Sequence, residues 1–361
     1  MTVYSFADFD QHEQVVFGND PKSGLKAIIA IHNTHLGPAL GGCRMYPYAS
    51  EEQALRDVLR LSRGMTYKSA LAELPLGGGK SVIIGDPAKH KSAELFQAMG
   101  RLVAGLSGRY ILAQDSGTSV EDLQEIATQT EHVAGIQRVL DDRGQTRSGD
   151  PSPATAYGVF VGLKAAVKHR LKRDSLAGVR VAVQGVGNVG FGLAKYLSAE
   201  GAELYVSDVN EKNLERAVAQ CGARVVEGDT IHRLEVDVFS PCALGGAIHE
   251  GNIDQLAAPV VAGAANNQLA SPELAELLRQ KEILYAPDFV INAGGIIHVH
   301  YMRTGRTWEE STRHVEGIAV NLEQIFQRAD ESGNTTAAIA DQIAEERFKP
   351  VPPFVAQSAV A

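Results

Sequence analysis

The feature that most constrains the fold is an apolar segment that runs directly into a glycine motif. Residues 179–185, VRVAVQG, lead into Gly185, Gly187 and Gly190 in the spacing G-x-G-x-x-G, and a helical pattern follows. In a strand–turn–helix unit these glycines allow a tight turn, close approach of the backbone to a pyrophosphate, and close helix packing. The helix N-terminus favours the anion electrostatically. The segment therefore predicts a dinucleotide site.

An acid at the end of the next apolar segment bears on which dinucleotide is bound. Asp208 follows Gly185 by 23 residues, close to the distance at which an acid bonds the ribose hydroxyls. Its charge opposes the extra phosphate of NADP, so NAD is expected, although Lys212 and Arg216 lie just beyond it. A glycine turn that binds no nucleotide is the alternative, and the strand, helix and acid in register argue against it.

Apolar runs alternate with helical-period segments along almost the whole chain, which is typical of an α/β fold with largely parallel, buried strands. We expect an N-terminal α/β substrate domain over 1–145 and a Rossmann-type doubly wound NAD-binding domain over 146–324. The helices from about 325 to 361 are expected to return to the first domain, with a loosely held tail. Helices are expected from Ser152, which with Pro153 forms an N-cap and first turn, and over 307–329 and 335–348. Strands are expected at 25–33, 80–87, 109–117, 179–185, 202–208, 236–241, 259–264 and 283–288.

Composition excludes several classes of protein. The 361 residues are 44% hydrophobic and 21% charged, which is ordinary for a globular protein. The net charge of -9 argues against nucleic acid as a partner. No secretion signal or membrane span is evident, and three distant cysteines fit neither a disulfide framework nor a zinc site. A cytoplasmic location and no bound metal are expected.

Two lysines stand in surroundings where lysine is unusual. Ser50 and Gln53 fit a capping box that opens a helix, on which Ala54, Val58, Leu61, Met65 and then Lys68 trace one stripe. Lys68 thus occupies a core position, either as a snorkelling side chain or as a ligand-binding cation. Lys80 follows three glycines at the expected start of a strand. The glycines indicate either a flexible turn or a place where a ligand approaches.

A carboxylate completes the set. Asp115 lies at the carboxyl end of the expected strand 109–117. Ser119 is better placed to cap the following helix, which leaves Asp115 free to face a cleft. We infer that Lys68 pairs with a substrate carboxylate, that NAD accepts a hydride, that Lys80 acts as base, and that Asp115 exchanges protons with the departing amino group. Together these roles indicate oxidative deamination of an amino acid.

The sequence resembles the leucine, phenylalanine and valine dehydrogenases, which are related to glutamate dehydrogenase. The resemblance covers nearly the whole chain. It rests on blocks in the same order, among them AIIAIHNTHLGPALGG (27–42), RGMTYKSA (63–70), LGGGKSVI (76–83), DPSPATAYG (150–158), VQGVGNVG (183–190), SPCALGG (240–246), GAANNQL (263–269) and YAPDFVINAGG (285–295). It implies NAD-dependent deamination of L-amino acids to 2-oxo acids and ammonia by a homo-oligomer, with catalysis in the cleft between the domains.

The resemblance also implies roles for matching positions. Lys80 and Asp115 correspond to the catalytic lysine and the proton-transferring acid, and Lys68 to the lysine that binds the substrate carboxylate. The implied substrate-binding set is Lys68, Leu40, Gly41, Ala113, Asn267, Ile296 and Val299. The implied cofactor-binding set is Thr155, Gly185, Val186, Gly187, Asn188, Val189, Gly190, Asp208, Cys242, Ala243 and Asn266.

Within the resemblance, four apolar positions bear on the substrate side chain: Leu40, Ala113, Ile296 and Val299. A branched Ile296 shrinks the pocket, so leucine, valine and isoleucine are expected over phenylalanine. A phenylalanine or broad-range enzyme is the first alternative, and a non-catalytic NAD-binding sensor is the second. His298 and His300 have no third metal ligand nearby and are expected to be structural.

Overall fold

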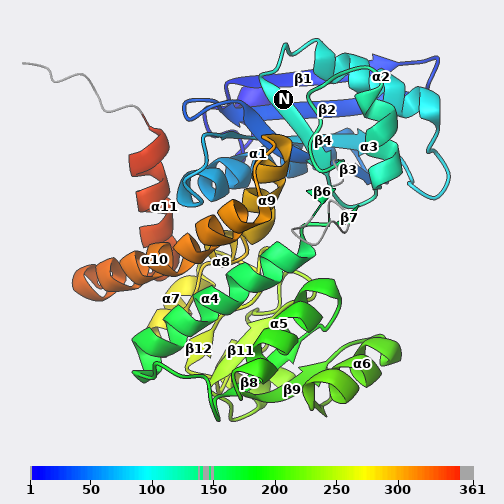
Figure 1. The fold of residues 1–361 in the computed structure, drawn as a ribbon. Helices are drawn as coiled ribbons and strands as arrows, with labels where there is room; N and C mark the ends of the chain where they lie inside the picture. The colour runs from blue at the N-terminus through cyan, green and yellow to red at the C-terminus, as the bar shows by residue number, and fades with distance from the viewer. Residues whose placement is uncertain (1, 137–138, 141–145, 148–149, 350–361) are drawn as a thin grey trace, which may run out of the picture.

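The computed structural model describes residues 2–136, 139–140, 146–147 and 150–349. Most of the segment that contains the expected domain boundary, and the tail 350–361, lie outside the described residues. The described chain holds two main sheets, seen at the top and bottom of Figure 1, with long helices between them.

The first sheet has five strands in the order β1-β2-β4-β3-β5. β1 is antiparallel to β2 and β2 to β4, whereas β4, β3 and β5 are parallel. Helix α1 packs on one face of this sheet, against Ile28 and Ala30 of β2. Helices α2 and α3 cover the opposite face, against Ile29 and Ile31 of the same strand. Burial on both faces explains the continuous apolar run. These elements are β1 Gln14–Asp20, β2 Leu25–Asn33, β3 Ala39–Tyr46, α1 Glu51–Leu71, β4 Gly77–Ile84, α2 Ala93–Ala104, β5 Tyr110–Gln114 and α3 Val120–Ala127.

The second sheet has six parallel strands in the order β10-β9-β8-β11-β12-β13. The strand order reverses between β8 and β11, as in a doubly wound dinucleotide-binding fold. The predicted α/β class with a Rossmann-type sheet is therefore confirmed. The elements here are α4 Ser152–Leu171, β8 Arg180–Gln184, α5 Asn188–Ala199, β9 Glu203–Ser207, α6 Glu211–Cys221, β10 Arg224–Val225, β11 Val238–Pro241, β12 Val260–Val261, α7 Leu274–Gln280, β13 Leu284–Tyr285, α8 Asp288–Ile291, α9 Gly294–Arg303, α10 Trp308–Ser332 and α11 Thr336–Phe348.

Short elements complete the description. β6 Val139–Leu140 pairs with β7 Thr146–Arg147, and three 3-10 turns lie at Val3–Ser5, Ile231–Arg233 and Ile253–Gln255. No helix in the described part of the chain is both long enough and apolar enough to cross a membrane.

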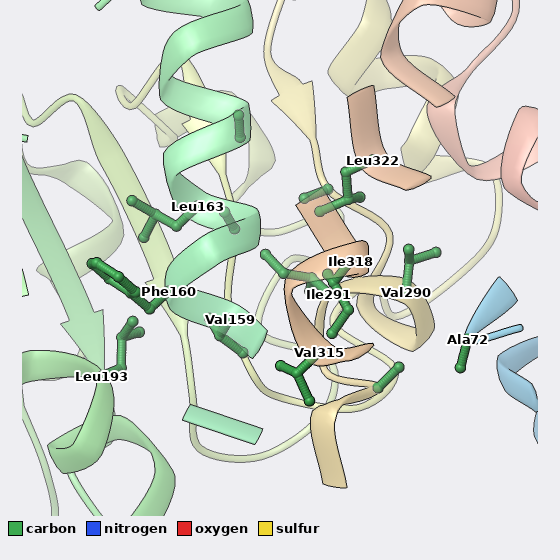
Figure 2. Close-up of a cluster of buried hydrophobic side chains, with 14 of the residues drawn as sticks. Ala72, Val159, Phe160, Leu163, Leu193, Val290, Ile291, Val315, Ile318 and Leu322 are labelled. Carbon is green, nitrogen blue, oxygen red and sulfur yellow. The ribbon is translucent and has the colours of Figure 1, made fainter. Parts of the chain in front are cut away.

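One hydrophobic cluster joins the C-terminal helices to the second sheet's helices. Figure 2 shows Val315 and Ile318 of α10 beside Val159 of α4 and Ile291 of α8. The same cluster extends to Ala72, just past the end of α1. The core is therefore continuous between the two halves of the molecule.

The C-terminal helices also satisfy the last carbonyls of α1, which have no partner within that helix. Arg347 of α11 donates to the carbonyls of Ala70 and Leu71 at 3.1 and 3.2 Å. Asn321 of α10 donates to Leu71 O at 2.8 Å, and His314 Nε2 lies 2.7 Å from Ala72 O. These bonds fix the end of α1 one turn beyond Lys68.

The residues expected to begin helices agree with the structure in part. Ser50 Oγ accepts the Gln53 N–H at 3.1 Å, but the Gln53 side chain accepts from Ala49, so the capping box is incomplete. Ser119 caps α3, as expected. Ser152 is the first residue of α4 rather than its N-cap, because Pro151 occupies that position.

The triple glycine is neither a turn nor an open approach. The strand expected over 80–87 is β4, which begins at Gly77, so the glycines lie inside the sheet and are buried. A Cβ on Gly78 would lie 2.0 Å from the backbone N of Thr66 in α1. The glycines let α1 lie directly on the strand that carries Lys80.

We therefore expect Gly78→Ala to destabilise the protein by about 3 kcal/mol, at the upper end of overpacking costs, because backbone atoms must move. Thermal or urea unfolding measures this change. Gly317→Ala in α10 is the matched control, since its added Cβ meets nothing within 4 Å, and it is expected to be neutral or slightly stabilising. Equal stability of the two variants would contradict this account of the glycines.

Candidate active site

Three parallel strands bring alternate residues to one face of the first sheet. Leu40, Gly42 and Arg44 alternate along β3, and β3 pairs with its neighbours in the register Leu40↔Gly78 and Gly42↔Ala113. Because side chains two apart share a face, this register places Lys80 of β4 and Ala113 of β5 beside Gly42. Asp115 follows one residue after β5 ends, at the same edge.

Lys80 and Asp115 form the centre of this face. Lys80 is only 6% exposed, and its Nζ donates to Asp115 Oδ2. Gly42 leaves room for the pair, because a Cβ there would lie 2.7 Å from Asp115 Cβ and 3.2 Å from Lys80 Nζ. Arg44 Nε donates to the same carboxylate oxygen at 3.2 Å. Burial raises the pKa of Asp115, but Lys80 and Arg44 outweigh it and hold the pKa below its ordinary value.

Lys68 approaches from α1. The residues 61, 65 and 68 of the expected apolar stripe line a cavity, while Ala54 and Val58 are buried in the core. Lys68 Nζ lies 3.5 Å from Asn266 Oδ1. Burial lowers the pKa of Lys68 to about 8, and Lys80 adds to this effect while Asp288 and Asp115 oppose it.

The cavity has a volume of about 510 Å³ and lies between the two sheets' helices and loops. Leu40, Ala113, Ile296 and Val299 contribute apolar wall. Ile296 and Val299 are three residues apart on α9 and so share its face. Of the expected substrate positions, Gly41 is not among the residues that line the cavity, because it packs against the backbone of Gly79. Asn267 lines the cavity with its backbone at φ 51°.

The glycine loop joins β8 to α5 beside this cavity. Gly185 has φ 93°, and a Cβ on Gly190 would lie 2.0 Å from Gly185 O, so both positions exclude larger residues. A Cβ on Gly187 would meet nothing within 4 Å, which leaves the open approach that a pyrophosphate needs. Val189 in the first turn of α5 lines the cavity. The loop therefore fits a dinucleotide.

The other expected cofactor residues surround this loop. Asp208 accepts the Val186 N–H at 2.8 Å through one oxygen and the Asn210 N–H at 2.8 Å through the other. Ala243 lies against Gly185, and Cys242 against Gly190. Asn188 is the first residue of α5. Thr155 and Asn266 line the cavity, and Asn266 Oδ1 accepts from Asn292 at 2.8 Å.

Sequence reasoning missed several charged residues of the site. Arg44 and Asp57 continue the Lys80–Asp115 pair, with Arg44 Nη1 2.8 Å from Asp57 Oδ2. Asp288, at the start of α8, lines the cavity, and burial raises its pKa although Lys68 opposes this. Asp341 of α11 also lines the cavity, and burial raises its pKa to about 6. Arg44 could have been found from the sequence, because it is two residues from Gly42 and four from Leu40, the spacing of side chains on one face of a strand. No sequence pattern indicated Asp341.

The two histidines of α9 lie in packed surroundings. His298 is buried and meets the Trp308 ring edge-on at 4.7 Å between centroids. The Nδ1 atom of His300 is buried without a hydrogen-bond partner among the described residues. Within residues 2–136 and 150–349, no group of three or more His, Cys, Asp or Glu is arranged to hold a metal ion.

Comparison with known proteins identifies the family. Residues 12–132 match the model of the Glu/Leu/Phe/Val dehydrogenase dimerisation domain, and residues 148–345 match the Glutamate/Leucine/Phenylalanine/Valine dehydrogenase model. The chain belongs to the Glu/Leu/Phe/Val dehydrogenase family. It is a nicotinamide-dependent amino-acid dehydrogenase, which catalyses oxidative deamination.

Individual relatives span nearly the whole of this dehydrogenase. Leucine dehydrogenase of Geobacillus stearothermophilus is 50% identical, and that of Bacillus subtilis (strain 168) is 49% identical; each match covers 97% of this chain and 94% of the relative. The crystal structure of L-tryptophan dehydrogenase from Nostoc punctiforme superposes with a TM-score of 0.82 at 44% identity, covering 94% of this chain and 96% of the other.

Proposed function

We propose that this dehydrogenase uses NAD to convert leucine, valine and isoleucine reversibly to their 2-oxo acids and ammonia. The observation that carries the proposal is that one cavity is lined by the charged residues Lys68, Lys80 and Asp115 and by the apolar residues Leu40, Ala113, Ile296 and Val299. A cation suits the substrate carboxylate, an acid–base pair suits the amino group, and an apolar wall suits an aliphatic side chain.

In the proposed reaction Lys68 binds the α-carboxylate and Asn267 helps to hold the amino acid. The bound nicotinamide supplies the hydride acceptor. Asp115, ionised at the start, accepts a proton from the substrate amino group as the imine forms. Lys80 removes a proton from the water that attacks the imine carbon, and Asp115 then returns its proton to the nitrogen, which leaves as ammonia. The direct contact between Lys80 and Asp115 allows a proton to pass between them, so the two groups can alternate as acid and base.

The choice of NAD over NADP rests on Asp208 and its neighbours. A carboxylate at the end of β9 suits ribose hydroxyls and opposes a 2′-phosphate. Arg216, one of the two cations that follow Asp208 in the sequence, already has partners: its guanidinium lies 3.9 Å from the Phe191 ring centroid and donates to Val186 O at 3.2 Å. We propose Thr155, residues 185–190, Cys242, Ala243 and Asn266 as the remaining cofactor contacts.

A homo-oligomer in the cytoplasm completes the proposal. β1 is an edge strand with Phe17 59% exposed, and it lies in the segment that matches a dimerisation domain. All three cysteines are unpaired, as is usual in a reducing compartment. We further propose a substrate and oligomerisation unit over 1–145 and a cofactor-binding unit over 146–324.

The test is an assay of NAD and NADP reduction by the purified protein at alkaline pH, with leucine, isoleucine, valine, phenylalanine, tryptophan, glutamate and alanine. We expect the highest kcat/KM with the branched aliphatic amino acids and NAD. Highest turnover with phenylalanine or tryptophan would contradict the substrate assignment. NAD binding without turnover of any amino acid would instead favour a sensor.

A broad-range or aromatic amino-acid dehydrogenase is the second candidate. It is favoured by the likeness to the tryptophan dehydrogenase of Nostoc punctiforme, which is 47% identical over 93% of both chains. In that case Lys68, Lys80 and Asp115 would have the same roles, and the apolar wall of the cavity would leave room for an aromatic substrate side chain.

Ile296→Ala tests which residues form that wall. Removing the branched side chain enlarges the cavity, so we expect the ratio of kcat/KM for phenylalanine to that for leucine to rise about tenfold or more. Ile297→Val is the control, because Ile297 is buried in the core of α9 and does not line the cavity. An unchanged ratio in Ile296→Ala would refute the pocket assignment.

A further inference from the structure

The described residues contain a second cavity next to the first, and Arg44 lies between them. The second cavity is lined by residues that include Tyr48, Arg56 and Asp57, and Arg44 lines both cavities. Arg44 is therefore the one side chain of β3 that reaches the Lys80–Asp115 pair and also faces a separate water-accessible space.

Arg44 connects two carboxylates, those of Asp115 and Asp57. Its Nε donates to Asp115 Oδ2 at 3.2 Å, and its Nη1 donates to Asp57 Oδ2 at 2.8 Å. Tyr48 donates its hydroxyl to the same Asp57 oxygen at 2.6 Å. Arg60 lies 3.6 Å from the other Asp57 oxygen. Asp57 is on α1, the helix that carries Lys68.

Arg44 and Lys80 therefore hold the Asp115 carboxylate through the same oxygen, Oδ2. Asp115 has no helix-capping role, since Ser119 and Asp122 form the capping box of α3. The rigid guanidinium fork of arginine fixes both position and charge, which an ammonium group does less well. Without Arg44, Lys80 would be the one cation bonded to Asp115, and the carboxylate could turn more easily about its Cα–Cβ bond.

We propose that Arg44, held by Asp57, is a positioning residue for the acid–base pair. It fixes the Asp115 carboxylate beside the substrate nitrogen, and its charge keeps that carboxylate ionised until it takes up a proton from the substrate amino group. The inference rests on the proposed function, in which Lys80 and Asp115 act on the substrate.

The titratable groups that interact with Asp115 come from several elements. Lys80 of β4, Arg44 of β3 and Lys68 of α1 interact with it from the cavity side, and the buried Cys43 of β3 and Tyr110 of β5 interact with it electrostatically from the core. The positive charges lower the pKa of Asp115, so removing Arg44 raises it. If ionised Asp115 is the active form, the acid limb of the pH profile of kcat/KM must move to higher pH.

The experiment compares Arg44→Gln and Arg44→Lys with wild type, using leucine and NAD, across the pH range. For Arg44→Gln we expect kcat to fall about tenfold or more and the acid limb to shift upward. Arg44→Lys should recover part of the rate, because it keeps the charge. Asp57→Asn should shift the limb in the same direction by less. Thermal unfolding of each variant measures any loss of fold.

Arg56→Gln is the matched control. Arg56 lines only the second cavity, pairs with Glu52 at 3.4 Å and lies over Phe6, so its removal should leave rate and profile as in wild type. A wild-type pH profile in Arg44→Gln would overturn the inference. So would a loss of rate in Arg44→Gln that is the same at every pH and that Arg44→Lys does not partly restore.

Asp115→Asn separates this inference from the proposed function. If Asp115→Asn is inactive while Arg44→Gln behaves as wild type, only the role of Arg44 fails. If Asp115→Asn keeps the wild-type rate, the proposed role of the acid fails, and the role of Arg44 with it.

Discussion

Replacing Lys80 with alanine is expected to lower kcat by about 10³-fold or more while leaving the affinity for NAD nearly unchanged. A positioned acid–base group contributes about 10²–10⁴-fold, and Lys80 is the buried amine in direct contact with Asp115. The glycine loop is on another sheet, so cofactor binding does not depend on this side chain. Steady-state kinetics and a fluorescence titration with NADH measure the two effects.

The control for this variant is Lys26→Ala. Lys26 is on β2 of the same sheet, but it is largely exposed and pairs with Glu51 at 3.8 Å, so full activity is expected. Arg44 still neutralises Asp115 in Lys80→Ala, which limits the cost to the fold. Residual turnover above about a tenth of wild type would place the base elsewhere.

Replacing Lys68 with alanine should act mainly on substrate affinity. Loss of a charge-assisted contact to the carboxylate is worth about 2–4 kcal/mol at a partly buried site, so we expect KM for leucine to rise by about 30- to 1,000-fold. Lys68 Nζ bonds to Asn266 and, among the described residues, makes no hydrogen bond to Lys80 or Asp115, so kcat should change much less. An unaltered KM would exclude Lys68 as the carboxylate site.

The charge on Lys68 also gives its site a pH dependence. With its pKa lowered to about 8 by burial, Lys68 is charged below that pH and loses its proton as the pH rises through it. The inhibition constant of 4-methylpentanoate, which has no amino group to titrate, should therefore increase above pH 8 in wild type. In Lys68→Ala the constant should be high at every pH; the same pH dependence in both proteins would point to another group.

The local pattern was enough to predict the Rossmann-type sheet of the second half. Strand, glycine motif, helix and Asp208 are consecutive in the chain, and each obeys a short-range rule. The structure places the glycine loop between β8 and α5 with Asp208 bonded to it. The residue pattern of this unit follows short-range rules, although β8 pairs with the distant β11, and this is why its sequence is readable.

The strands of the first sheet were harder to predict from the sequence, because two of them contain several glycines. β3 reads as ALGGCRMY and β4 as GGGKSVII, and glycine is depleted in strands. Tertiary contact requires these glycines, since α1 and the neighbouring strands lie too close for a Cβ at Gly41 or Gly78. The start of β4 and the existence of β3 follow from packing that no local rule describes.

The sequence by itself determined the fold class, the glycine loop, and the residue types needed for amine chemistry. Only the tertiary structure decided that Lys80 touches Asp115, that Arg44 links this pair to Asp57, and that α11 brings Asp341 to the cavity. The physical reason is the distance along the chain over which each kind of interaction acts. Propensity, capping and periodicity act over a few residues, whereas strand register and the docking of α10 and α11 on α1 join residues up to 278 positions apart.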